Sequence, residues 1–265
     1  MPSAPSGPRP FNRIPALAVA LVCVLFLISC TTMKKPTTTP GLRSEQFTWR
    51  TARGATQYLL HLPKDYDARS GRKWPLMLFL HGAGERGTDV GKVAVHGPLK
   101  HVKQGKDFPF IIVAPLCPAG EQWANGPLLQ LLDEIGRKFA VDPGRVYLTG
   151  LSMGGYGAWF LGLAHPERFA AIAPTCGGGN IISVTLAQHY ESKRFAAMKG
   201  LGVWAFHGAK DTTVPLEESE RMVNALKRAG CTDVRLTVYP NTGHNSWVEA
   251  YEDPALYEWL LKHER

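Results

Sequence analysis

The sequence predicts a single α/β domain built on a mostly parallel sheet with helices on both faces. Short runs that are apolar throughout recur along the chain, as in strands that are covered on both sides. Segments with helical spacing separate these runs, which is typical of a doubly wound sheet. The 27 glycines and 20 prolines indicate many turns, and the 45% hydrophobic content excludes a disordered chain. The 265 residues suit one large domain.

The first 29 residues are predicted to be a secretory signal. Arg9 and Arg13 precede an apolar stretch, residues 14–28, that is shorter than a typical membrane span. The stretch ends in Leu-Ile-Ser-Cys, which resembles a bacterial lipobox. We therefore expect Cys30 to become the lipidated N-terminus of an exported cell-envelope protein. A conventional signal with a chance cysteine, or an uncleaved anchor, is the alternative.

A threonine- and proline-rich tether is predicted over residues 30–44, followed by the folded domain over residues 45–265. From Thr31 to Gly41 the chain is polar and aperiodic, as in a semi-extended spacer. The net charge of +8 is scattered along the chain, so it favours anionic surroundings only weakly. No nucleic-acid partner is predicted.

The folded domain contains three cysteines, Cys117, Cys176 and Cys231. Their number is odd, and no pair has the spacing of a metal site. An oxidising compartment permits a disulfide between Cys117 and Cys176. The alternative is that all three are small buried residues.

Eight strands are expected, of which the first two read as a hairpin-like antiparallel start. They are residues 47–51, 57–62, 75–80, 110–116, 145–149, 170–174, 203–206 and 234–239. Four segments have apolar residues at helical spacing, and Gly230 follows the third as a natural C-terminal cap. These helices are residues 127–139, 153–164, 216–229 and 255–262. No internal repeat and no second domain are evident.

A glycine-rich turn separates the strand at 145–149 from the helix at 153–164. Residues 150–155 read Gly-Leu-Ser-Met-Gly-Gly and match the pattern G-x-S-x-G. In this strand-to-helix setting the pattern predicts a nucleophile elbow, which lifts the Ser152 hydroxyl to the top of the sheet. Gly150 and Gly154 suit a turn too tight for side chains. A purely structural turn is the alternative.

A serine hydroxyl needs a base to take its proton, and that base needs a carboxylate to orient it. His244 follows the last strand through a short loop, and Asp211 follows the strand at 203–206. This is the chain order Ser, Asp, His that the elbow predicts. Ser152, Asp211 and His244 are therefore the expected triad.

Other candidates for these two roles are less well placed. Glu217 and Glu218 begin a helix, where acidic residues favour the helix dipole. Asp233 precedes a strand and so lies at the wrong end of the sheet. His81 and His207 each stand in a His-Gly pair at a strand end, where we expect them to brace loops.

The oxyanion that forms during acyl transfer needs two backbone N–H donors. Met153, directly after the nucleophile, is expected to supply one. Residues 81–87, His-Gly-Ala-Gly-Glu-Arg-Gly, are expected to supply the other, with Ala83 as first choice and Gly84 as second. A phosphate-binding loop is the alternative, but the segment lacks the spacing of such loops.

Residues 46–263 resemble single-domain α/β-hydrolase carboxylesterases, in particular bacterial polyhydroxybutyrate-depolymerase-like and feruloyl-esterase-like enzymes, which are also similar to the prolyl oligopeptidase catalytic domain. The matching stretches are residues 81–87, 114–123, 150–159, 172–179, 204–215 and 243–247. The resemblance implies an α/β-hydrolase fold with an eight-stranded sheet and no large cap domain. It also implies ester hydrolysis through an acyl-enzyme, with no cofactor and no metal.

Carried over by motif, the resemblance assigns the same triad and the same oxyanion donors. It also places Trp123 and Trp247 in loops that flank the site, where they line an aromatic or sugar-bearing substrate or simply pack. Residues 183–198 are longer than in these relatives and carry Lys193 and Arg194, which predicts a small lid. An open site suits small-molecule or polymer-linked esters.

Three functions remain open at this point. The first is a lipid-anchored serine carboxylesterase acting on carbohydrate-linked, hydroxycinnamoyl or short acyl esters. The second is a serine peptidase of prolyl-oligopeptidase type, although no gating domain accompanies the triad. The third is a non-catalytic envelope-binding lipoprotein, which has no need of a strained elbow. Fold alone does not decide among them.

Overall fold

The computed structural model describes Met1, residues 40–48 and residues 55–265. Residues 36–265 form one compact unit. The signal predicted to end at residue 29, the lipidated Cys30 and the tether up to residue 39 lie outside the described residues, apart from Met1. These remain predictions of the sequence.

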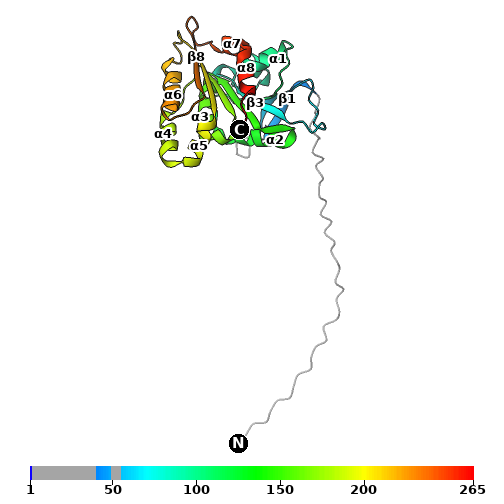
Figure 1. Ribbon diagram of the computed structural model, residues 1–265. Coiled ribbons are helices and arrows are strands. Elements are labelled where there is room, and N and C mark those ends of the chain that lie inside the picture. The colour runs from blue at the N-terminus through cyan, green and yellow to red at the C-terminus, as the bar shows by residue number, and fades with distance from the viewer. Residues whose placement is uncertain (2–39, 49–54) are drawn as a thin grey trace. The chain divides into compact units, whose positions relative to one another are not determined.

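Eight strands form one sheet in the order β1-β2-β4-β3-β5-β6-β7-β8 (Figure 1). β2 pairs antiparallel with both β1 and β4, and the other neighbours are parallel. The strands are β1 Gly41–Thr48, β2 Ala55–Leu62, β3 Trp74–Leu80, β4 Ile111–Pro115, β5 Val141–Leu151, β6 Ala171–Thr175, β7 Gly202–Gly208 and β8 Val234–Tyr239. The predicted α/β-hydrolase fold with an eight-stranded, mostly parallel sheet is confirmed.

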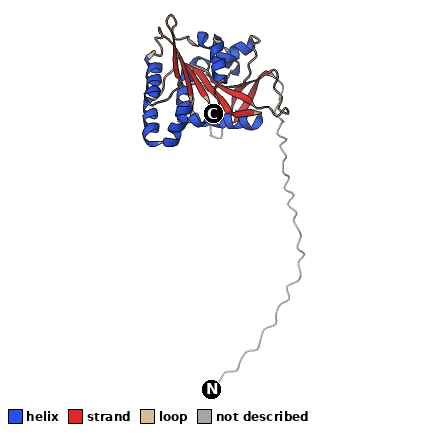
Figure 2. Cartoon of the chain, in the orientation of Figure 1, coloured by secondary structure: helices blue, strands red, loops and turns tan. Residues whose placement is uncertain are grey.

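Helices cover both faces of the sheet (Figure 2). β3 shows why this arrangement forms. Its side chains alternate between the two faces, so Leu76 and Leu78 enter one core cluster while Met77 and Phe79 enter the other. α2 to α6 bury side chains in the first cluster, and α1, α7 and α8 in the second. The helices are α1 Gly97–Lys103, α2 Asn125–Lys138, α3 Met153–Ala164, α4 Ile181–Tyr190, α5 Ser192–Gly200, α6 Glu217–Arg228, α7 Trp247–Glu252 and α8 Pro254–Leu261.

Two strands differ from their predicted bounds. β1 begins at Gly41, inside the segment predicted as tether. Its backbone ladder to β2 runs from Gly41 to Thr48, and its apolar residues Leu42 and Phe47 are too few for a strand pattern that begins at Gly41. β5 begins at Val141 and includes the predicted turn at 142–144. The pairing with β3 jumps from Val141 to Val146, so the turn forms a bulge within the strand.

The connection between β6 and β7 contains only the two short helices α4 and α5, which the sequence did not predict as helices. The absence of a large cap domain is therefore confirmed for this segment. Among the described residues, no helix is both long and apolar enough to cross a lipid bilayer.

Candidate active site

Ser152 stands at the junction of β5 and α3 with an unusual backbone conformation, φ 53° and ψ −117°. Such a conformation strains a residue with a side chain and places it on a sharp turn. The turn tolerates no bulk beside it. A Cβ atom on Gly150 would lie 2.3 Å from the Gly154 carbonyl oxygen, and one on Gly154 would lie 2.0 Å from the Leu80 carbonyl oxygen. The glycines of the motif therefore allow the elbow to form.

Loops at the carboxyl ends of β5, β7 and β8 bring the three predicted triad residues together. The Ser152 hydroxyl donates to His244 Nε2 over 2.9 Å. His244 Nδ1 in turn donates to Asp211 Oδ2 over 2.7 Å. This tautomer leaves the Nε2 lone pair facing the serine, so His244 is placed to accept the serine proton.

Asp211 is held as a carboxylate by the loop that carries it. Asp211 is 9% exposed, and the N–H groups of Thr213 and Val214 each donate to its Oδ1 over 2.9 Å. Burial by itself raises the pKa of Asp211, but the hydrogen bonds from His244 and the two N–H groups outweigh it. The pKa of Asp211 therefore lies below its usual value.

The other two strand-end histidines, His81 and His207, are structural braces. His81 Nδ1 donates to the Gly82 carbonyl over 2.6 Å, and Nε2 accepts from the Cys117 N–H over 3.0 Å. Burial lowers the pKa of His81, which agrees with a neutral ring. His207 Nε2 donates to the Val214 carbonyl over 2.9 Å and so holds the Asp211 loop.

The carboxylates that rivalled Asp211 lie elsewhere. Glu217 and Glu218 are in the first turn of α6, and Glu218 pairs with Arg221 over 2.6 Å. Asp233 precedes β8, at the opposite end of the strands from Ser152, and pairs with His263 over 2.6 Å. None of these three is hydrogen-bonded to His244 in the described residues.

The predicted oxyanion donors lie beside Ser152. Ala83 begins a short 3-10 turn, Ala83–Glu85, whose loop is fixed by its own charged residues. The Glu85 carboxylate accepts from the Gly82 N–H over 2.9 Å, and Arg86 Nε donates to the Ala83 carbonyl over 3.0 Å. Within the described residues, the N–H groups of Ala83 and Met153 donate to no protein acceptor. Both donors are therefore available to a substrate oxygen.

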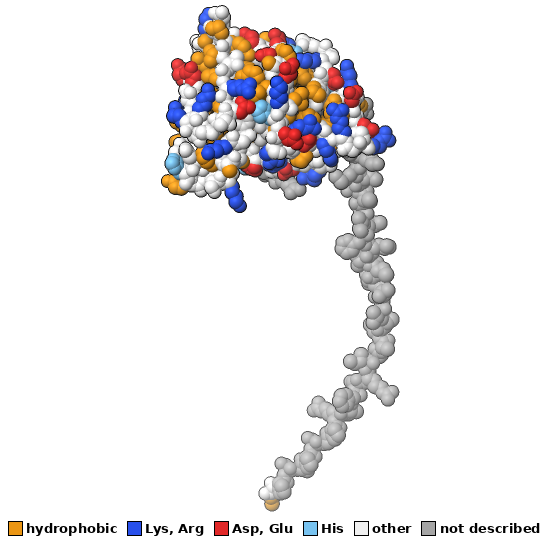
Figure 3. Space-filling view, viewed as in Figure 1, with side chains coloured by type: hydrophobic (Ala, Val, Ile, Leu, Met, Phe, Trp, Pro, Cys, Tyr) orange, Lys and Arg blue, Asp and Glu red, His pale blue; other side chains and the backbone are white. Residues whose placement is uncertain are grey.

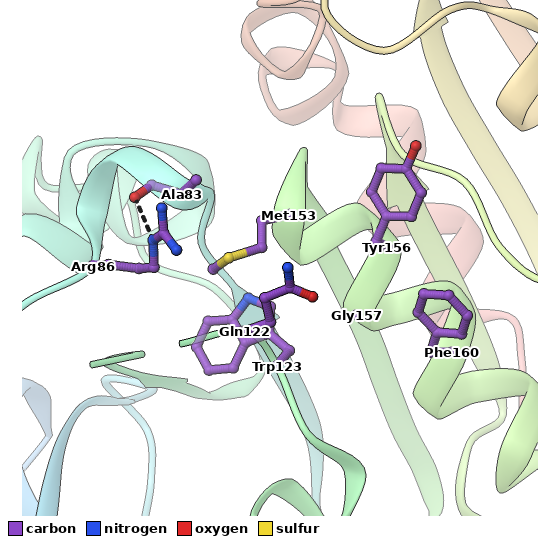
Figure 4. A pocket seen from close by; sticks show the side chains of 8 residues that line it. All are labelled: Ala83, Arg86, Gln122, Trp123, Met153, Tyr156, Gly157 and Phe160. Atoms are coloured by element: carbon purple, nitrogen blue, oxygen red, sulfur yellow. Dashed lines mark hydrogen bonds between the residues drawn. The ribbon is translucent and has the colours of Figure 1, made fainter. Parts of the chain in front are cut away.

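A cavity of about 410 Å³ adjoins these donors (Figure 4). Aromatic side chains from a loop and from α3 form much of its wall, and Tyr156 and Phe160 stack at 6.5 Å. Its lining residues are Ala83, Arg86, Gln122, Trp123, Met153, Tyr156, Gly157 and Phe160. Trp123 is fixed by a hydrogen bond from Nε1 to the His81 carbonyl over 3.0 Å. α4 and α5 contribute no residue to this lining, so the predicted lid does not cover the cavity.

Trp247 does not line this cavity. Its ring meets the His244 ring edge to face, with centroids 5.4 Å apart and planes at 89°. The centroid of the His96 ring lies 5.3 Å from that of Trp247. Trp247 therefore contacts the triad histidine, whereas Trp123 lines the cavity.

Cys176 is a neighbour of the triad that the sequence analysis did not single out for this role. It has a left-handed φ of 41°, and its Sγ accepts from the Ser152 N–H over 3.2 Å. Burial raises the pKa of Cys176 to about 12, so it remains a thiol. Cys117, Cys176 and Cys231 are all free and buried, so the candidate disulfide is absent and the alternative of three buried thiols holds.

Comparisons with known proteins relate the chain to ester-hydrolysing enzymes. The family model described as phospholipase/carboxylesterase matches residues 124–260. A probable feruloyl esterase C from Aspergillus terreus is 27% identical over 81% of this chain and 74% of its own length. A bifunctional acetylxylan esterase/xylanase from Neocallimastix patriciarum is 25% identical over 55% of this chain, which spans only 20% of that protein.

A solved structure, that of a thermostable esterase, is also similar. It superposes with a TM-score of 0.68 and 32% identity, covering 84% of this chain and 63% of the other.

Among the described residues, no group of three or more His, Cys, Asp or Glu side chains could hold a metal ion.

Proposed function

Because the chain belongs to the phospholipase/carboxylesterase family of ester-hydrolysing enzymes, we propose that it is a serine hydrolase that cleaves carboxylic esters through an acyl-enzyme. The observation that carries the proposal is the continuous hydrogen-bond chain from the Ser152 hydroxyl through His244 to Asp211. In this proposal Ser152 is the nucleophile, His244 the base and Asp211 the orienting acid.

In the first half-reaction, Ser152 Oγ attacks the ester carbonyl carbon while its proton passes to His244 Nε2. The carbonyl electron pair moves onto oxygen, where the N–H groups of Ala83 and Met153 stabilise the charge. When this pair returns to re-form the carbonyl, the bond to the alcohol oxygen breaks. His244 gives its proton to that oxygen, and the alcohol leaves.

In the second half-reaction, water repeats the attack on the acyl-enzyme. His244 takes one proton from the water as its oxygen adds to the acyl carbon. The tetrahedral intermediate then expels Ser152 Oγ, which recovers its proton from His244. The ionised Asp211 stabilises the imidazolium in both halves, and its lowered pKa keeps it charged throughout.

The 410 Å³ cavity is assigned to the acyl group of the substrate. The leaving oxygen must lie near His244 to receive its proton, and His244 does not line the cavity, whereas Ala83 and Met153 do. The acyl group therefore extends away from His244, between Trp123 and Phe160. Aromatic walls of this kind support hydroxycinnamoyl or short acyl groups, and the name of the feruloyl esterase supports a hydroxycinnamoyl group. The name of the acetylxylan esterase supports carbohydrate-linked esters.

The proposed location is the cell envelope, with Cys30 lipidated and residues 31–40 as the spacer. The lipobox-like sequence supports this part of the proposal. Cys30→Ser should leave the protein unprocessed or release it from the membrane fraction, measured by fractionation and by the mass of the mature N-terminus. Normal processing and anchoring of this variant would remove the lipoprotein assignment.

The activity itself is tested with residues 36–265, the compact unit, as wild type and as Ser152→Ala. The substrates are a series of p-nitrophenyl acyl esters, methyl ferulate and a peptide p-nitroanilide. Ester turnover that is lost in the variant supports the proposal. The series of p-nitrophenyl acyl esters shows which acyl lengths the cavity accepts. Turnover of the amide alone would favour a peptidase. No turnover of any substrate would favour a non-catalytic binding protein.

A further inference from the structure

α4 exposes an apolar row that the active site does not use. Ile182, Leu186 and Tyr190 are 60%, 44% and 81% exposed. They are spaced four residues apart, so they lie above one another on one face of the helix. The opposite face holds Val184 and Ala187, which are buried in the core. A contiguous apolar surface of this kind marks an interaction site.

The same helix, Ile181–Tyr190, contains no Asp, Glu, Lys or Arg, and His189 in its last turn is its one basic residue. The outer face of a surface helix normally carries charged or polar side chains. In Figure 3 the lower left of the domain, where Figure 1 places α4, is mostly white and orange. α4 therefore presents an apolar surface without a charged rim of its own.

The neighbouring helix α5 supplies positive charge. Lys193 and Lys199 are exposed, and α5 contains no acidic residue. Arg194 joins the two helices by donating to the Ser183 carbonyl over 2.8 Å, and it pairs with Glu191 over 3.2 Å. The pair of helices thus combines an apolar row with two exposed lysines, of which Lys199 also lies 5.0 Å from the centroid of the Phe195 ring.

This surface is separate from the proposed catalytic site. No residue of α4 or α5 lines the acyl cavity. α4 packs against α6 and α5, and α5 packs against the turn Pro166–Arg168 near the opposite ends of the strands. The helix pair is therefore neither a lid nor a substrate wall in this structure.

We propose that the α4–α5 surface, defined by Ile182, Leu186, Tyr190, Lys193 and Lys199, binds the interface of an anionic lipid bilayer. The apolar row enters the boundary between headgroups and acyl chains, and the lysines meet the lipid phosphates. A second copy of this chain fits less well. In a two-fold contact this surface meets itself, and neither helix has an acidic residue for the lysines, while Glu191 between them already pairs with Arg194.

The proposed lipid anchor would keep the α4–α5 surface close to a bilayer. In that respect the inference rests on the proposed envelope location. Residues 31–40 separate Cys30 from the first strand, and ten extended residues reach about 35 Å at most. The domain is thus confined near the bilayer, where even a weak second contact is occupied at high effective concentration. The α4–α5 surface would then fix which side of the domain faces the lipid.

The test uses residues 36–265, which contain both core clusters and lack the lipidated cysteine. Partitioning is measured by flotation with phosphatidylcholine vesicles and with vesicles of equal phosphatidylglycerol and phosphatidylcholine. Wild type should float with the anionic vesicles. The triple variant Ile182→Asn, Leu186→Asn, Tyr190→Ser should lose about tenfold or more in partitioning. Lys193→Gln with Lys199→Gln should lose about 25-fold, at about fivefold per lysine.

The matched control replaces three exposed apolar residues elsewhere, Val95, Val238 and Leu261, by asparagine. This control should partition like wild type. All variants should keep wild-type turnover of a soluble p-nitrophenyl ester, which separates the membrane contact from folding and from the proposed activity. Three results would overturn the inference. They are absence of wild-type flotation, equal flotation of the triple variant, and a dimer in sedimentation equilibrium that the triple variant dissociates.

Discussion

Two histidine–aspartate pairs in the described residues have nearly the same separation but lie at opposite ends of the parallel strands. His244 Nδ1 lies 2.7 Å from Asp211 Oδ2 in loops after the carboxyl ends of β7 and β8, and His263 Nε2 lies 2.6 Å from Asp233 Oδ2 before the amino end of β8. Hydrogen bonds outweigh burial in both pairs, so the pKa of each aspartate is below its usual value. Neither distance nor electrostatics distinguishes a catalytic pair from a structural one.

The second ring nitrogen makes the difference. His244 Nε2 faces the Ser152 hydroxyl and can accept its proton. His263 Nδ1 lies 2.8 Å from the Trp259 carbonyl oxygen and its Nε2 lies 2.6 Å from Asp233 Oδ2, so both nitrogens face acceptors and neither faces a hydroxyl. A histidine–carboxylate pair thus becomes a base only where the chain also places a hydroxyl on the far nitrogen.

The largest expected effect separates the two histidines. His244→Ala should lower kcat for a p-nitrophenyl ester by about 10⁵-fold or more, because the serine loses its base. His263→Ala should leave kcat within about threefold, since His263 lies near the amino ends of β7 and β8, away from Ser152. Steady-state kinetics at matched protein folding, checked by circular dichroism, measure both. A comparable loss in the two variants would mean that the pairs are not functionally distinct.

Substitution of Asp211 should lower kcat more than substitution of Asp233, by a smaller factor than for the two histidines. Asp211→Asn should lower kcat by about 10⁴-fold, because the amide no longer favours the required tautomer of His244. Asp233→Asn should again remain within about threefold of wild type. Unchanged kinetics for the Asp211 variant would transfer the acid role to another carboxylate.

Loss of the His263–Asp233 pair should lower the stability of the fold and not the activity. Asp233→Asn should lower the free energy of unfolding by about 1 kcal/mol at neutral pH, a modest value because Asp233 is partly exposed. For a domain of this size the melting temperature should fall by about 2–4 °C. Thermal melts of the two proteins at pH 7 measure this change.

The stability lost in Asp233→Asn should depend on pH in one direction. Folding lowers the pKa of Asp233 below 3.8, so its contribution is present above that pH and is lost as the pH falls through the folded value. The difference between wild type and Asp233→Asn should therefore shrink in acid. A difference that stayed constant to low pH would show that the hydrogen bonds to the ionised carboxylate are not its origin.

The sequence predicted the parts of the site that depend on strand ends and tight turns. Ser152, Asp211 and His244 each follow a recognisable strand, and parallel strands bring such loops together. The sequence could not reveal Arg86 as the donor to the Ala83 carbonyl or Cys176 as a neighbour of the Ser152 N–H, because neither contact follows from spacing along the chain.

The fold was predictable for the same reason, and the prediction of single elements failed where the apolar pattern is weak. Buried strands such as β3 are apolar throughout and were found almost to the residue. β1 is a polar edge strand, and its first residues were read as tether. α4 was missed because its exposed row is as apolar as its buried face, so it has no amphipathic period to detect.

The central claim is that His244, and not a histidine–aspartate pair in general, activates Ser152. Labelling with a fluorophosphonate, followed by mass spectrometry of the modified peptide, tests it most directly. Wild type and His263→Ala should carry the adduct on Ser152, whereas His244→Ala and Ser152→Ala should remain unlabelled over the same time. Labelling of His244→Ala at the wild-type rate, or an adduct on another residue of the wild type, would contradict the account.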